Sequence, residues 1–148
     1  MKELINIIEL KHCDTGIKLN PAASIEKIEK TEVLLGFKLP EDFKEFYQIC
    51  DGFECQEDIF NFLPLEDLLR EGDHGKDWAV FAEYMIHSDV WSLRVLEKGY
   101  EIFYNDGHEI VLTNSLTTFL ERFLKGNVFD EEGLYEWRDE IKKSQQLL

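Results

Sequence analysis

The chain has 148 residues and a formal net charge of −15, from 31 acidic and 16 basic residues. Hydrophobic residues make up 44% of it, which supplies a core and excludes an intrinsically disordered chain. The charge argues against nucleic acids and anionic membrane surfaces as partners, because both are themselves negative. It favours encounter with a basic protein, although an acidic surface also serves plain solubility.

The acidic residues are concentrated in two segments. Residues 41–73 contain eleven acidic and two basic residues, a net charge of −9. Residues 130–140 contain six acidic and one basic residue, a net charge of −5. The sequence therefore predicts local acidic surfaces and not a uniform one.

No repeat, low-complexity segment or linker divides the sequence, so we expect one domain over residues 1–148. The longest hydrophobic run, 78–82, is far too short to cross a bilayer. Polar residues interrupt the first ten positions, which therefore lack the apolar region of a signal peptide. Together these features predict a cytoplasmic protein with reduced cysteines.

A short first helix is predicted by apolar residues at helical spacing within the first ten positions. Its inward face would consist of Leu4, Ile5 and Ile8. Residues 11–24 follow as a predicted loop that contains Gly16 and Pro21, both typical of loops.

A second helix is predicted from the capping residue Ser24 to Gly36. Glu32 falls on its apolar face and needs a hydrogen-bond donor there, which the N-terminus of the next helix would supply. The apolar residues of that face are Ile25, Ile28 and Leu35.

A third helix is predicted to begin at Pro40, because proline suits the first helical turn. Glu41 and Asp42 follow, where carboxylates favour the positive end of the helix dipole. The Asp51-Gly52 pair ends the helix. Its buried face, spaced i, i+3, i+4 and i+7, would consist of Phe43, Phe46, Tyr47 and Cys50.

The middle of the chain changes to strand-like patterns rich in β-branched and aromatic residues. A short helix interrupts them at Leu65, and the polar loop 72–77 is either a connector, which we favour, or a recognition loop. The Asp106-Gly107 pair is the strongest hairpin signal. The expected strands cover residues 59–63, 80–87, 90–96, 100–104 and 109–113.

Two helices are predicted at the C-terminal end. The first would be capped by Asn114 or Ser115 and end at Gly126, and the second would cover residues 130–145. Helices, then strands, then helices again indicate an α+β fold. We expect a single domain with a mostly antiparallel β-sheet, flanked by helices at the N- and C-terminal ends of the chain.

Part of this sequence resembles the signature of the SUKH superfamily, which includes bacterial immunity proteins and a yeast cell-wall-synthesis regulator. The specific part covers residues 25–52, and the later order of elements extends the resemblance to Gly126, with 130–145 as an extension. Asp51 stands where members more often have Asn, an exchange of one turn residue for another. The matching pattern is Ile28-x-x-x-Glu32-x-x-Leu35-Gly36-x-x-Leu39-Pro40-x-x-Phe43-x-x-Phe46, followed by Asp51-Gly52.

The resemblance implies a protein-interaction domain with no shared catalytic residue and no cofactor. Bacterial members bind and neutralise a toxin, often a nuclease or a deaminase. We therefore expect a non-enzymatic cytosolic immunity protein, monomeric or weakly dimeric, that blocks a basic toxin domain. The alternative is an intracellular scaffold module without a toxin partner, and a small hydrolase using paired carboxylates ranks third. The expected partner-binding residues are Glu41, Asp42, Glu45, Glu54, Glu57 and Asp58.

Other chemistry has weak support in the sequence. Cys50 and Cys55 are spaced C-x4-C, outside the common zinc spacings, so we expect no metal site. Cys50 is better explained as a buried helix position. Trp91 and Trp137 are interpreted as core residues in preference to interface anchors. No nucleophile elbow, phosphate-binding loop or H-E-x-x-H motif occurs.

Overall fold

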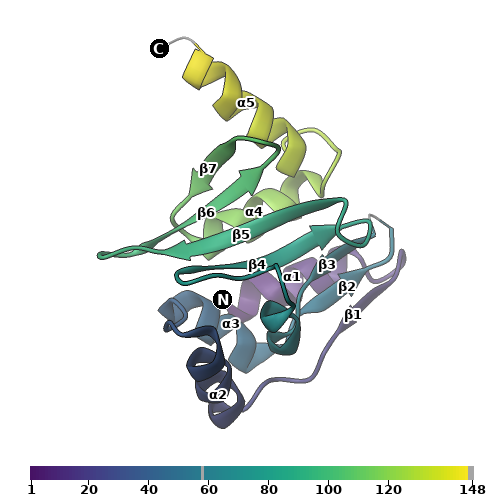
Figure 1. Cartoon of the computed structure of the whole chain (residues 1–148). Coiled ribbons are helices and arrows are strands. Elements are labelled where there is room, and N and C mark those ends of the chain that lie inside the picture. The colour runs from purple at the N-terminus through teal and green to yellow at the C-terminus, as the bar shows by residue number, and fades with distance from the viewer. Residues whose placement is uncertain (58, 147–148) are drawn as a thin grey trace.

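Within the described residues, 1–57 and 59–146, seven strands form one antiparallel sheet whose spatial order follows the chain (Figure 1). The structure is a computed structural model. The sheet and its flanking helices confirm the predicted α+β fold. The strands are β1 (Ile17–Leu19), β2 (Phe53–Cys55), β3 (Phe60–Phe62), β4 (Trp78–Tyr84), β5 (Asp89–Val95), β6 (Tyr100–Asn105) and β7 (Glu109–Thr113).

The helices leave part of one face of the sheet open. α1, α3 and α4 cover the same face, α5 lies beside β7, and α2 packs against the 3-10 helix η1 (Figure 1). None of the helices in the described part of the chain has the length and apolar character that a membrane span requires. The helices are α1 (Lys2–Lys11), α2 (Ile25–Leu35), α3 (Glu41–Ile49), η1 (Leu65–Leu69), α4 (Leu116–Gly126) and α5 (Leu134–Gln146).

Stacked aromatic rings fix these helices to the sheet. Phe46 of α3 stacks on Phe62 of β3 with ring centroids 4.0 Å apart, and Phe123 of α4 stacks on Phe60 at 4.4 Å. All four side chains are fully buried. Burying one apolar side chain of this size contributes about 1.5–3 kcal/mol, so these pairs are major terms in stability. The predicted inward face of α3, Cys50 included, is confirmed.

The second helix follows its prediction at both ends and at Glu32. Ser24 accepts a hydrogen bond from the backbone of Lys27 at 3.1 Å, and Gly36 closes the helix at φ +88°. Glu32 Oε2 accepts from the Leu39 amide at 2.7 Å, immediately before α3, as expected.

Ile25 departs from the predicted apolar face of α2, because its side chain is 60% exposed. A helical side chain points back toward the helix N-terminus and covers the preceding turn. Because Ile25 is the first residue of α2, no helical turn precedes it. The buried residues of α2 are Ile28, Thr31 and Leu35.

Several element boundaries differ from those predicted. β1 lies inside the predicted loop 11–24, and β2 was not predicted; each has only three residues, too few to show a period. β4 ends at Tyr84 and not at residue 87, because the next residues form a left-handed turn. α5 begins at Leu134 and not at residue 130, after a loop in which Gly133 packs against the backbone of Gly126.

Candidate partner-binding site

A row of polar side chains crosses the open face of the sheet. Lys18 of β1 pairs in register with Glu54 of β2, Glu54 with Asn61 of β3, and Asn61 with Glu83 of β4. Successive residues of a strand point to opposite faces. Because the strand neighbours of Glu54 and Asn61 are buried in the core, the row itself faces away from the helices.

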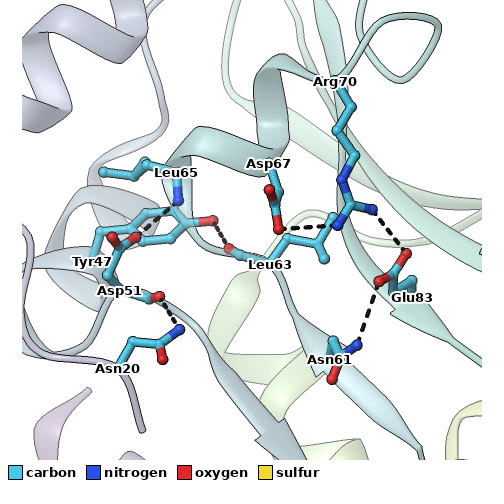
Figure 2. Close-up of polar contacts among 9 residues, drawn as sticks. All are labelled: Asn20, Tyr47, Asp51, Asn61, Leu63, Leu65, Asp67, Arg70 and Glu83. Carbon is cyan, nitrogen blue, oxygen red and sulfur yellow. Dashed lines mark hydrogen bonds and ion pairs between the residues drawn. The ribbon is translucent and has the colours of Figure 1, made fainter. Parts of the chain in front are cut away.

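Glu83 is a buried carboxylate within this row, with 2% of its surface exposed. Its Oε2 pairs with Nη1 of Arg70 at 3.1 Å, and its Oε1 accepts from Asn61 at 3.4 Å (Figure 2). Arg70 also reaches Asp67 Oδ2 at 3.0 Å. A buried charge needs such partners, and these contacts fasten the end of η1 over β3 and β4.

Asp51 provides a second anchor on the opposite side of η1 (Figure 2). Its Oδ1 accepts from the Leu65 amide at 2.8 Å, and its Oδ2 pairs with Lys27 Nζ at 2.5 Å. The hydrogen bond to Asp51 raises the pKa of Lys27. Asn20 donates to the Asp51 carbonyl at 2.9 Å. Asp51 therefore does more than the turn role we expected, because it joins α2, the 20–24 loop and η1.

Gly52 completes this anchor through its backbone. Its φ is +82°, a conformation that L side chains rarely adopt. A Cβ atom there would lie 2.3 Å from the Phe62 carbonyl oxygen, closer than any real contact. The Asp51-Gly52 pair of the signature is thus required by the geometry of the chain.

These elements enclose a groove of about 730 Å³ over β2, β3 and β4. Its walls are the 20–24 loop, the first turn of α2 and η1. Both cations in its lining, Lys27 and Arg70, are already paired with lining carboxylates. Glu54 and Glu66 are exposed and make no ion pair with another described residue. The acidic residues of the lining are Asp51, Glu54, Glu66, Asp67 and Glu83.

A family model described as the SMI1 / KNR4 family (SUKH-1) matches residues 22–122, about two thirds of the chain. The chain belongs to this SUKH-1 family. The matched region contains most of the groove, η1 and the six strands from β2 to β7, while α1, β1 and α5 lie outside it. No curated protein matches the chain as a relative. The superfamily assignment made from the 25–52 signature is confirmed.

The SUKH-1 groove is suited to holding a cation. Its two exposed carboxylates lie beside fully paired ones, so an incoming ammonium or guanidinium group would find free acceptors.

Elsewhere, burial raises the pKa of the Cys50 thiol to about 12 and keeps it protonated at neutral pH. Within residues 1–57 and 59–146, no group of three or more His, Cys, Asp or Glu side chains is placed to hold a metal ion.

Three of the expected partner-binding residues lie on α3, away from the groove. Glu41 is exposed at the first position of the helix. Asp42 is half-buried, accepts from the Leu116 amide at 3.1 Å and also binds the Tyr100 hydroxyl, so it ties α3 to α4 and β6. Glu45 is exposed, 3.7 Å from the N-terminal amine.

Two of the other three expected residues, Glu54 and Glu57, lie around the β2–β3 hairpin. Glu54 faces the groove, and Glu57 lies in the turn, 3.7 Å from Nδ1 of His12. Asp58 lies outside the described residues. Of the five expected residues that the structure describes, one, Glu54, lies in the groove, and the role of all six in binding stays a prediction.

Three residues of the groove lining, Glu66, Glu83 and Arg70, were not predicted from the sequence. A signal for Glu83 existed, since this carboxylate interrupts the apolar strand 78–84 and a buried carboxylate needs a partner. Naming that partner, Arg70, required the position of η1 over β4, which the sequence does not show.

Proposed function

We propose that this SUKH-1 protein is a non-enzymatic cytoplasmic immunity protein that binds and neutralises a basic toxin domain of the nuclease or deaminase type. The observation that carries the proposal is the groove in which both cations are already paired while Glu54 and Glu66 remain exposed. Such a site accepts a lysine or arginine side chain from a partner.

The chemistry of the partner explains why an acidic protein would inhibit it. A domain that acts on nucleic acid binds the phosphate backbone with lysine and arginine side chains. A protein that pairs with the same side chains competes with the substrate for them. Close interfacial charge pairs have coupling energies of about 1.5–7 kcal/mol, and long-range attraction raises the association rate.

The test uses the purified protein and the product of the adjacent gene, because an immunity gene must be inherited with its toxin. Calorimetry at low and high salt should give a complex whose affinity falls with salt, since exposed charge pairs are screened. The double variant Glu54→Lys/Glu66→Lys should weaken binding strongly. The matched control Glu97→Lys/Glu121→Lys changes the net charge equally at exposed sites outside the groove and should have a much smaller effect.

If the two double variants weakened binding equally, the net charge of the protein and not the groove would explain the affinity. Absence of any complex with the adjacent product would favour the alternative of an intracellular scaffold module without a toxin partner.

A further inference from the structure

Four apolar side chains are exposed together at one end of the sheet: Ile59 (48%), Met85 (46%), Ile86 (82%) and Phe129 (55%). We call them the loop-end patch. They lie in the β2–β3 turn, the β4–β5 turn and the α4–α5 loop, at the right-hand end of the molecule in Figure 1. The Met85 amide donates to the Ile59 carbonyl at 3.0 Å, and the Phe129 ring lies 4.9 Å from that of Tyr84.

The loop-end patch lies next to the groove, where β3 begins and β4 ends. Ile59 immediately precedes β3, two residues before Asn61, and Met85 immediately follows β4, two residues after Glu83. Asn61 and Glu83 are a paired couple in the groove lining. A partner that fills the groove and extends past this end of β3 and β4 would therefore reach Ile59 and Met85.

The backbone of the patch has an unusual conformation for its residue types. Ile59, Met85, Ile86 and His87 all have positive φ, between 47° and 73°. A β-branched residue is a genuine outlier there, whereas glycine and asparagine adopt the conformation readily. Ile86 gains almost nothing from burial in return, since 82% of its surface is exposed. Folding alone would favour another residue at this position.

The turn that carries Ile86 is nevertheless held in place. The Ser88 amide donates to the Tyr84 carbonyl at 3.1 Å, and the Ser88 hydroxyl donates to the Met85 carbonyl at 3.2 Å. His87 Nε2 lies 2.7 Å from Asp73 Oδ1. An apolar side chain presented on a fixed turn loses little conformational entropy when a partner covers it.

The charges around the patch indicate what covers it. Glu57 on one side and the exposed run Asp130, Glu131 and Glu132 on the other form an acidic rim. A second copy of this chain would bring the same carboxylates against them, and an anionic membrane would be repelled in the same way. The complementary surface is therefore basic, with an apolar recess.

We propose that the loop-end patch, with Ile86 as its most exposed member, is the apolar contact of the partner interface and inserts into an apolar recess on a basic protein. This inference rests on the proposed function. It adds to the ion pairs of the groove a contact that salt does not screen.

The decisive variant is Ile86→Asn, because asparagine tolerates the left-handed conformation and removes the apolar surface. Its urea midpoint should equal or exceed that of the wild type, while its affinity for the adjacent-gene product should fall about tenfold or more. The matched control is Val33→Asn on α2, which removes an equally exposed apolar side chain (80%) and should leave the affinity unchanged. A second variant, Ile86→Gly, should repeat both results.

Each other outcome overturns the inference in a recognisable way. An unchanged affinity in Ile86→Asn would show that the partner does not contact the patch, while the proposed function would still stand. A lower stability in both Ile86 variants assigns Ile86 to folding. A dimer in sedimentation at high salt that Ile86→Asn abolishes makes a second copy the occupant. No binding by the wild type overturns the proposed function and this inference with it.

Discussion

Replacing Asp51 tests whether the signature pair is structural. In Asp51→Ala the buried amide of Leu65 loses a charged acceptor at 2.8 Å, and Lys27 loses its partner at 2.5 Å. Asn20 and the surrounding loop keep their bonds to the main chain of residue 51. The perturbation is therefore confined to two side-chain contacts.

The magnitude follows from the burial of each contact. A hydrogen bond from a buried amide to a carboxylate is worth about 1.5–3 kcal/mol. Lys27 is 40% exposed, which limits its pair to roughly 0–1 kcal/mol. Asp51→Ala should therefore reduce the free energy of unfolding by about 2–4 kcal/mol, which corresponds to a fall in Tm of roughly 5–15 °C at this chain length.

Urea denaturation followed by tryptophan fluorescence and by circular dichroism measures this difference. Asp51→Asn keeps an oxygen for the Leu65 amide and loses only the charge, so it should cost about 1 kcal/mol or less, as should Lys27→Met. If Asp51→Asn proved as destabilising as Asp51→Ala, the charge pair and not the buried amide would be the important contact, and our reasoning would be wrong.

Three further predictions concern stability and reactivity. Burial and the charge of Lys11 lower the pKa of His12. As the pH falls below about 6.5, the unfolded chain therefore binds a proton at His12 before the folded protein does. The stability of the wild-type protein should fall over this pH range. His12→Phe, which can keep the stack on Phe123, should lose less stability over the same range of urea titrations. Gly52→Ala should lower the free energy of unfolding by clearly more than the roughly 1–2 kcal/mol expected for Gly107→Ala, because both glycines have positive φ but only Gly52 lacks room for a Cβ. Equal losses in the two variants would show that the Cβ at residue 52 does not clash. Alkylation at pH 8 with mass spectrometry should label exposed Cys13 and spare buried Cys50, and early labelling of Cys50 would show that it is not held in the core.

The helices α2, α3 and α4 were predictable because each carries apolar residues at helical spacing and a local signal at its ends. Ser24 and Gly36 mark one helix by their own chemistry, and Ser115 caps another by accepting from the Thr118 amide. These interactions connect residues close in sequence, so the sequence alone shows them. β1 and β2, with three residues each, gave no such signal and exist through their pairing with each other and with β3.

The site was less predictable because its contacts join distant residues. Asp42 was expected to be free for a partner, yet its side chain binds the Leu116 amide, 74 residues away. Glu83 meets Arg70 only because η1 folds back over β4. Clusters of charge in the sequence show how many carboxylates there are, and only the register of the strands shows which of them remain unpaired.

The central claim is that this SUKH-1 protein neutralises a basic toxin domain, and growth rescue tests it most directly. Cells that make the adjacent-gene product should stop growing, and wild-type protein should restore growth and co-purify with that product. Glu54→Lys/Glu66→Lys should fail to restore growth while remaining folded, and Glu97→Lys/Glu121→Lys should succeed. Arrested growth that the folded wild-type protein does not relieve would contradict the account.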